Sequence, residues 1–124
     1  MADNETKILI CDDSILARKS LKEILNSFNY EDIVEVADGQ TVIDTYKILK
    51  PDIVFLDIVM PVKDGITAVK EIIQFDSKAC IIMVSSVGTQ THLKEAIKSG
   101  AKDFIQKPVD PEQLKQILNH CIGD

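Results

Sequence analysis

Five polar side chains stand directly after short aliphatic runs of this 124-residue sequence. Asp12 and Asp13 follow KILIC, Asp57 follows DIVFL, Ser85 follows CIIMV and Lys107 follows DFIQ. Carboxylates that are brought together disfavour one another's ionisation, and a hard divalent cation relieves that repulsion. For a site of oxygen ligands the expected ion is Mg²⁺, held by a few carboxylates and several waters.

Asp57 points most clearly to a reaction. It lies within the apolar stretch IVFLDIVM, where burying a carboxylate is costly unless it is paired or coordinates a metal. An Asp can act as a nucleophile and form an aspartyl phosphate. Mg²⁺, Lys107 and Ser85 would then neutralise or hydrogen-bond the phosphoryl oxygens. The residue types therefore favour phosphoryl transfer onto Asp57.

Each of these residues also has a purely structural interpretation. Asp12 and Asp13 can cap the helix that follows them. Ser85 can cap the next turn, with Ser86 as a rival for any role, and Lys107 alone is typical of a surface lysine. Only their joint placement at one edge of a sheet favours a functional site.

The aliphatic runs predict five β-strands. The near-continuous apolar character of the first, third and fourth runs is typical of parallel strands buried on both faces. Between the runs, apolar residues recur with helical spacing. The pattern (βα)5 predicts an α/β fold with an open, doubly wound parallel sheet, in one domain over residues 1–124. The expected strands are Lys7–Cys11, Ile33–Val36, Asp52–Leu56, Cys80–Val84 and Asp103–Gln106.

Helix boundaries carry their own signals. Asp38, Asp64 and Asp110 are expected as N-caps, and Pro111 fits the first position of a helix. Gly100 is expected to end a helix in the left-handed conformation. Ligands of such folds bind beyond the carboxyl ends of the strands, which is where the five polar residues stand.

Composition limits the class of partner. Lys and Arg total 14 and Asp and Glu total 20, which gives a formal charge of −6 and argues against direct nucleic-acid binding. The start, MADNET, lacks the features of a signal peptide, and the apolar runs are too short for membrane insertion. We therefore expect a cytoplasmic protein.

The motifs resemble those of response regulator receiver domains of bacterial two-component signalling, of the CheY type. The resemblance covers essentially the whole chain, and it implies a flavodoxin-like sheet with strand order 2-1-3-4-5. The matching segments are ILICDDS (8–14), PDIVFLDIVMP (51–61), DG (64–65), MVS (83–85) and AKDFIQKP (101–108).

The resemblance implies roles at the acidic site. Asp57 corresponds to the phospho-acceptor, Asp13 to a direct Mg²⁺ ligand and Asp12 to an acid that acts largely through water. The backbone carbonyl of Val59 corresponds to the remaining protein ligand of Mg²⁺.

The resemblance also implies a conformational switch. Lys107 corresponds to the lysine that contacts the phosphoryl group and precedes a cis proline, Pro108. Ser85 corresponds to the hydroxyl that moves toward that group, and Phe104 to the aromatic residue that follows it inward. The implied partner surface comprises the fourth helix, the fifth strand and the fifth helix, with Leu93, Ile97 and Phe104.

Three residues depart from the usual pattern of the family. Phe104 stands where many members have Tyr, so a partner contact that needs a phenolic hydroxyl is in doubt. Val59 and Val87 are apolar at positions next to the site that are often polar, which predicts an altered rate of autodephosphorylation.

The implied function is a signalling switch that accepts a phosphoryl group from a histidine kinase and then binds a downstream target protein, with chemotaxis as the leading setting. Such a protein catalyses only its own aspartyl phosphorylation and dephosphorylation. The alternatives are a receiver domain excised from a larger regulator, a phosphatase of haloacid-dehalogenase type, and a flavodoxin-like cofactor binder. The spacing of Asp12, Asp13 and Ser14 disfavours the phosphatase, and the two acids would repel a cofactor phosphate.

Overall fold

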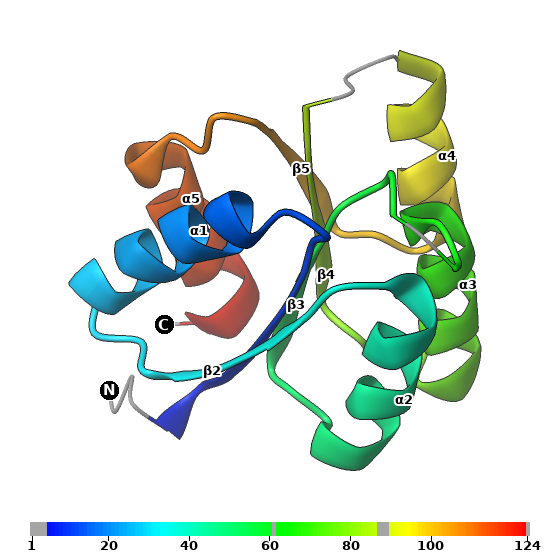
Figure 1. The fold of residues 1–124 in the computed structure, drawn as a ribbon, viewed down its shortest axis with the longest axis horizontal. Coiled ribbons are helices and arrows are strands. Elements are labelled where there is room, and N and C mark those ends of the chain that lie inside the picture. Colours follow the sequence, from blue (N-terminus) through cyan, green and yellow to red (C-terminus); the bar gives the residue numbers. More distant parts are fainter. Residues whose placement is uncertain (1–4, 61, 87–89, 124) are drawn as a thin grey trace.

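The computed structural model describes residues 5–60, 62–86 and 90–123 and contains one five-stranded sheet (Figure 1). All pairings are parallel, and the strand order is β2-β1-β3-β4-β5. The expected α/β fold and strand order are confirmed. The strands are β1 (Lys7–Cys11), β2 (Asp32–Val36), β3 (Ile53–Leu56), β4 (Ile81–Ser85) and β5 (Asp103–Gln106).

Helices cover both faces of the sheet. Figure 1 shows α1 and α5 on one side and α2, α3 and α4 on the other, as right-handed crossovers between parallel strands require. A π-helical turn, Asn119–Gly123, follows α5. Among the described helices, none has both the length and the apolar character that crossing a membrane requires. The helices are α1 (Ile15–Ser27), α2 (Gly39–Leu49), α3 (Gly65–Phe75), α4 (Gln90–Ser99) and α5 (Pro111–Leu118).

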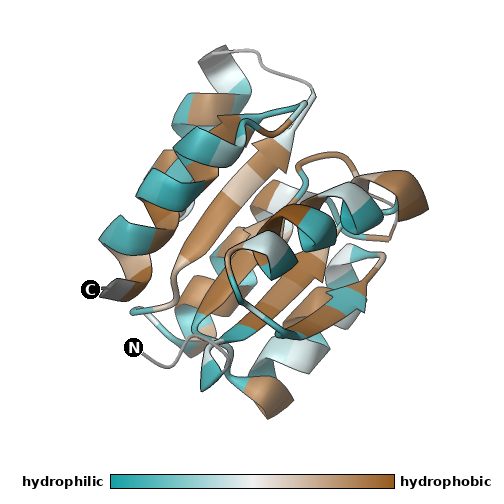
Figure 2. Cartoon of the chain, turned by 90° about the vertical axis from the view of Figure 1, so that its left-hand side faces the viewer, coloured by the Kyte–Doolittle hydropathy of each residue, from teal (hydrophilic) through white to brown (hydrophobic). Residues whose placement is uncertain are grey.

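The core divides into two layers because successive side chains of a strand point to opposite faces. In β1, Leu9 packs beneath α2 and α3, whereas Ile8 and Ile10 pack beneath α1 and α5. In β3, Leu56 packs on the side of α2 and α3, and Phe55 packs on the side of α1 and α5. Figure 2 shows the apolar strands lying between helices whose outer surfaces are polar. The two apolar layers cover the central strands β1, β3 and β4, and the polar residues of interest stand at the ends of these strands.

The helix boundaries follow the expected capping signals. The side chains of Asp38, Asp64 and Asp110 cap α2, α3 and α5, and Gly100 follows α4 with a φ of 125°. For α1 the cap is Ser14, whose hydroxyl accepts a hydrogen bond from the Ala17 N–H. Asp12 and Asp13 are therefore not needed as the cap of this helix.

Three strands differ by one residue from their expected limits. β2 begins at Asp32, and β3 begins at Ile53. β4 is shifted by one position, so Ser85 is its last residue instead of following it. The Lys107 N–H donates to the Ser85 carbonyl at 3.0 Å, so the pairing of β4 with β5 continues into the segment after β5.

Candidate functional site

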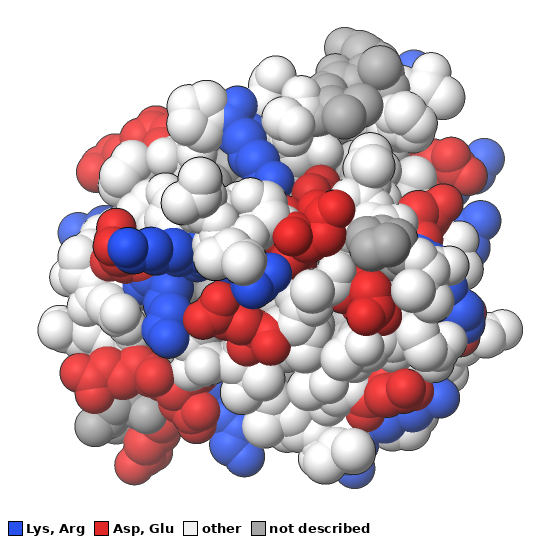
Figure 3. Space-filling view, in the orientation of Figure 1, with Lys and Arg blue, Asp and Glu red and all other residues white. Residues whose placement is uncertain are grey.

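Three carboxylates meet at the carboxyl edge of the sheet. One oxygen each from Asp12, Asp13 and Asp57 lie within 4.8 Å of one another. Asp12 and Asp57 are 5% and 7% exposed, whereas Asp13 faces solvent. Figure 3 shows acidic side chains gathered near the point where β1 ends in Figure 1, with basic side chains beside them. The predicted acidic cluster is therefore present, with two of its members buried.

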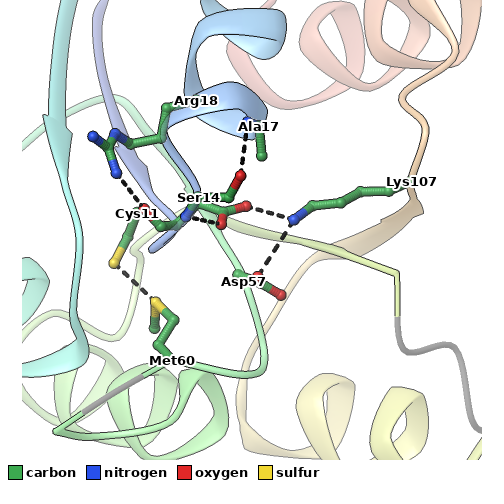
Figure 4. A network of polar contacts seen from close by, with 8 residues as sticks. Cys11, Ser14, Ala17, Arg18, Asp57, Met60 and Lys107 are labelled. Atoms are coloured by element: carbon green, nitrogen blue, oxygen red, sulfur yellow. Dashed lines mark hydrogen bonds and ion pairs between the residues drawn. The ribbon is translucent and has the colours of Figure 1, made fainter.

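Lys107 reaches into this cluster from the chain after β5 (Figure 4). Its Nζ lies 2.6 Å from Asp12 Oδ2 and 3.4 Å from Asp57 Oδ2. The expected cis peptide bond joins Lys107 to Pro108. One ammonium group therefore pairs with two carboxylates that would otherwise repel each other.

Ser85 is the buried hydroxyl of the site. It is 1% exposed, whereas Ser86 is exposed, so of these two serines only Ser85 is buried with the acids. The Ser85 side chain acts on Asp57 as a hydrogen-bond partner that opposes the rise in the pKa of this carboxyl. Sequence order alone could not distinguish these neighbours, but the alternation of side chains at the end of β4 turns them to opposite faces.

The environment acts on the pKa of both Asp57 and Lys107. Burial, and after it the charge of Asp12, raises the pKa of Asp57, against the opposing effects of Lys107 and of the Ser85 hydrogen bond. Burial would lower the pKa of Lys107, but the hydrogen bond to Asp12 and the charges of Asp57 and Asp12 together raise it. These shifts make the Asp57 carboxylate easier to protonate and keep Lys107 in its charged form.

Backbone hydrogen bonds place the carboxylates at neighbouring strand ends. The Asp12 N–H donates to the Val36 carbonyl at 3.2 Å, and the Asp57 N–H donates to the Cys11 carbonyl at 3.0 Å. The pairing of β1 with β2 and β3 therefore continues one residue beyond the strands. This rigid framework fixes where the two buried acids leave the sheet.

Gly65, the first residue of α3, packs against the backbone of Asp57. A Cβ atom there would overlap the Asp57 carbonyl oxygen and lie 2.8 Å from the Ile58 Cα. We expect Gly65→Ala to lower the free energy of unfolding by about 1–3 kcal/mol, as overpacking does. We also expect weaker Mg²⁺ binding because Asp57 must move, measured by urea unfolding and calorimetric titration.

Gly100→Ala is the matched control for that prediction. Its new Cβ would overlap the Ile73 side chain at a positive φ, in the segment between α4 and the start of β5, whereas the acids follow the ends of β1 and β3. It should reduce stability and leave Mg²⁺ affinity unchanged. Equal losses of Mg²⁺ affinity in both variants would contradict a specific role for Gly65.

The donor set fits a hard divalent cation. Three carboxylates supply oxygen atoms. Burial, and after it the charge of Asp12, raises the pKa of Asp57, and a bound cation would oppose both effects. Val59 lies in the loop after β3, two residues beyond Asp57, and its side chain is 57% exposed. That Asp13, Asp57 and the Val59 carbonyl hold Mg²⁺ remains a prediction.

The expected aromatic switch residue lies on β5, and the expected partner residues lie on α4 and β5. Phe104 is half-buried and packs against the core layer beneath α2 and α3. Ile97 is 46% exposed, and together with Leu93 it lines a shallow groove on α4 that Phe104 does not line. Val87 lies outside the described residues.

Residues that the sequence did not single out complete the surroundings of the site. Arg18 donates to the Asp12 carbonyl oxygen at 2.7 Å. The Cys11 thiol lies 3.0 Å from the sulfur of Met60 and donates to the Asp38 carbonyl at 3.3 Å. Figure 4 shows the contacts of Arg18 and of Cys11 with Met60 to the left of the carboxylates. Nothing in their spacing along the chain indicates them, because each contact joins different elements.

Comparison with known proteins gives consistent relatives. Residues 8–119 match the response regulator receiver domain family. The chemotaxis protein CheY of Thermotoga maritima is 46% identical over 113 residues, which are 91% of this chain and 94% of that protein. The Bacillus subtilis CheY is 43% identical over 117 residues, 94% of this chain and 98% of that protein.

Solved structures agree in fold. CheY in a CheX–CheY complex with BeF3 and Mg²⁺ from Borrelia burgdorferi is 37% identical, with a TM-score of 0.88, over 96% of this chain and 90% of that chain. The receiver domain of a sensor histidine kinase from Pseudomonas aeruginosa, with magnesium in its active-site cleft, is 26% identical, with a TM-score of 0.87, over 96% of this chain and 98% of that chain. This chain belongs to the response regulator receiver domain family.

Proposed function

We propose that this protein is a phosphorylation-dependent signalling switch whose phospho-acceptor is Asp57. The supporting observation is the placement of a buried carboxylate between Asp12, Lys107 and Ser85 at the carboxyl edge of the sheet. The whole chain acts as a single receiver domain. Its catalysis is limited to the formation and loss of its own aspartyl phosphate.

Asp57 provides the nucleophile. A carboxylate oxygen attacks the phosphorus of the donor, a P–O bond forms to Asp57, and the donor's bond to phosphorus breaks with its electron pair leaving on the donor. The donor is the phosphohistidine of a histidine kinase, or a small acyl phosphate in its place. Lys107 keeps its proton and pairs with the phosphoryl oxygens, for which its present partner Asp12 already holds it in position.

Asp13, Asp57 and the Val59 carbonyl would hold Mg²⁺, with Asp12 acting through water. When bound, Mg²⁺ neutralises the negative charge shared by the acids and the incoming phosphoryl group. The buried pair of Asp12 and Asp57 supports this assignment, because their mutual repulsion disfavours two ionised carboxylates without a further cation.

Incubation with acetyl phosphate tests this function. Intact-protein mass spectrometry should detect a single added phosphoryl group in the presence of Mg²⁺ and none when EDTA removes the metal. Absence of the adduct at saturating donor and Mg²⁺ would rule out the proposal. Steady turnover of a generic phosphomonoester, abolished by Asp12→Asn, would support a phosphatase instead.

The output is a changed surface formed by α4, β5 and α5. The Ser85 hydroxyl already contacts Asp57, so a phosphoryl group there would give it a new acceptor. Phe104 would follow it inward, which would change the surface near Leu93 and Ile97 that binds a target protein. The CheY relatives favour chemotaxis as the setting, with a histidine kinase upstream.

Ser85→Ala should separate phosphorylation from response. Asp57 keeps its nucleophile and its Lys107 contact, so the phosphoryl group should still be incorporated. Without the hydroxyl, the amide shifts of α4 and β5 that phosphorylation causes should become smaller, as measured by two-dimensional NMR. Shifts equal to those of the phosphorylated wild type would contradict the assigned switch role, and Ser86→Ala, which changes the exposed neighbour, is the matched control.

A further inference from the structure

The backbone and side chain of Asp12 are held from four sides. Its N–H donates to Val36, Oδ1 accepts from the Ser14 N–H at 2.9 Å, and Oδ2 accepts from Lys107 at 2.6 Å. The fourth contact is made by Arg18, whose Nη1 donates to the Asp12 carbonyl oxygen at 2.7 Å. Arg18 thus holds the peptide group that leads into Asp13, and Figure 4 shows it on the opposite side from Lys107.

Arg18 is itself held in place. Arg18 lies on α1, and its Nε donates a hydrogen bond to Oε1 of Glu35 at 3.0 Å. Glu35 is a residue of β2. Lys22, one turn further along α1, pairs with the other Glu35 oxygen at 3.3 Å. The Arg18 side chain is only 16% exposed. These contacts therefore link α1 to the segment after β1 and to Glu35 of β2.

The turn that carries Asp12 and Asp13 needs such a restraint. Three carboxylates with oxygens within 4.8 Å of one another repel, and Asp13 is exposed to solvent. The planar guanidinium presents several donors in a fixed geometry, so Arg18 can bind the Asp12 carbonyl and the Glu35 carboxylate at the same time. A Lys ammonium at the same place offers a single point of attachment.

We propose that Arg18 is a positioning residue for metal binding. Held by Glu35, it fixes the Asp12 carbonyl and thereby keeps the Asp12–Asp13 turn in the geometry that a divalent cation requires. The inference rests on the proposed Mg²⁺-dependent function and adds a residue that touches neither the metal nor the phosphoryl group.

The charge of Arg18 and its positioning role predict opposite changes in Mg²⁺ affinity when Arg18 is replaced. Arg18 is a cation near three acids, so removing its charge alone would strengthen Mg²⁺ binding. Removing the restraint would weaken Mg²⁺ binding, because the acids would then have to be ordered when the metal binds. The direction of the change therefore separates the two effects.

Calorimetric Mg²⁺ titration of the full chain provides the test. We expect Arg18→Met to weaken Mg²⁺ binding about tenfold, within the range typical of groups that orient metal ligands. Arg18→Lys, which keeps the charge and is the gentler change, should also weaken it. Lys22→Met is the matched control: it removes a positive charge from the same Glu35 without touching Asp12, and should leave the affinity unchanged or slightly tighter.

Phosphorylation gives a second readout. With acetyl phosphate, both Arg18 variants should need more Mg²⁺ for half-maximal phosphorylation and should approach the wild-type rate when Mg²⁺ is saturating. Unchanged or tighter Mg²⁺ binding in folded Arg18→Met or Arg18→Lys would overturn the positioning role while leaving the proposed function intact. Failure of the wild type to bind Mg²⁺ would overturn both.

Discussion

Asp57→Asn is expected to abolish phosphoryl incorporation. The amide lacks the ionised oxygen that attacks phosphorus, while its size and shape preserve the packing of a residue that is 7% exposed. Loss of one negative charge also relieves the repulsion with Asp12, so the variant should fold at least as stably as the wild type. Phosphate-affinity gel electrophoresis after incubation with acetyl phosphate and Mg²⁺ measures the loss.

Asp52→Asn is the matched control for this result. Asp52 stands just before β3, at the opposite end of the strand from Asp57, and its carboxylate accepts from the Lys7 N–H at 2.8 Å. This variant removes the same charge and should be phosphorylated like the wild type. A shifted band that persists in Asp57→Asn would place the acceptor elsewhere.

Lys107→Met is expected to have the second large effect, because it leaves two nearly buried carboxylates without their cation. The distances of 2.6 and 3.4 Å to Asp12 and Asp57 indicate close pairing. Removing one partner of a buried pair typically costs about 3–5 kcal/mol. Lys107 is 22% exposed, so solvent screening reduces the expected loss of unfolding free energy to about 1–3 kcal/mol.

Urea unfolding with EDTA or with Mg²⁺ measures this loss. Mg²⁺ binds the native state and replaces part of the missing positive charge, so it should stabilise Lys107→Met more than the wild type. Phosphorylated Lys107→Met should also show a weakened response at α4 and β5. Lys102→Met removes an exposed lysine just before β5 and serves as the control. Equal stability of Lys107→Met and Lys102→Met in EDTA would contradict a stabilising pairing of Lys107 with Asp12 and Asp57.

The sequence was sufficient to predict the fold and the central acids. Parallel strands place their carboxyl ends at one edge, so Asp12, Asp13 and Asp57 could be assigned to one crevice before any contact was known. Lys107 belonged to the same edge by the same argument, and its contacts with Asp12 and Asp57 confirm that placement. Side-chain chemistry and the parallel (βα)5 pattern follow from local patterns, whereas the strand order 2-1-3-4-5 came from the resemblance to receiver domains.

Other features depended on packing between distant elements. Arg18 resembles any basic residue on the surface of a helix, and its contacts with Asp12 and Glu35 depend on how α1 lies against β2. The distinction between Ser85 and Ser86 depended on where β4 ends, which the aliphatic pattern placed one residue too early. Strand ends are set by pairing with neighbouring strands as well as by hydrophobicity.

Borohydride reduction of the phosphorylated protein tests the central claim most directly. Hydride converts an aspartyl phosphate to homoserine, and peptide mass spectrometry then identifies which of the clustered acids carried the phosphoryl group. We expect homoserine at position 57 and unmodified Asp at positions 12 and 13. Homoserine at position 12 or 13, or its formation at none of the three, would contradict it.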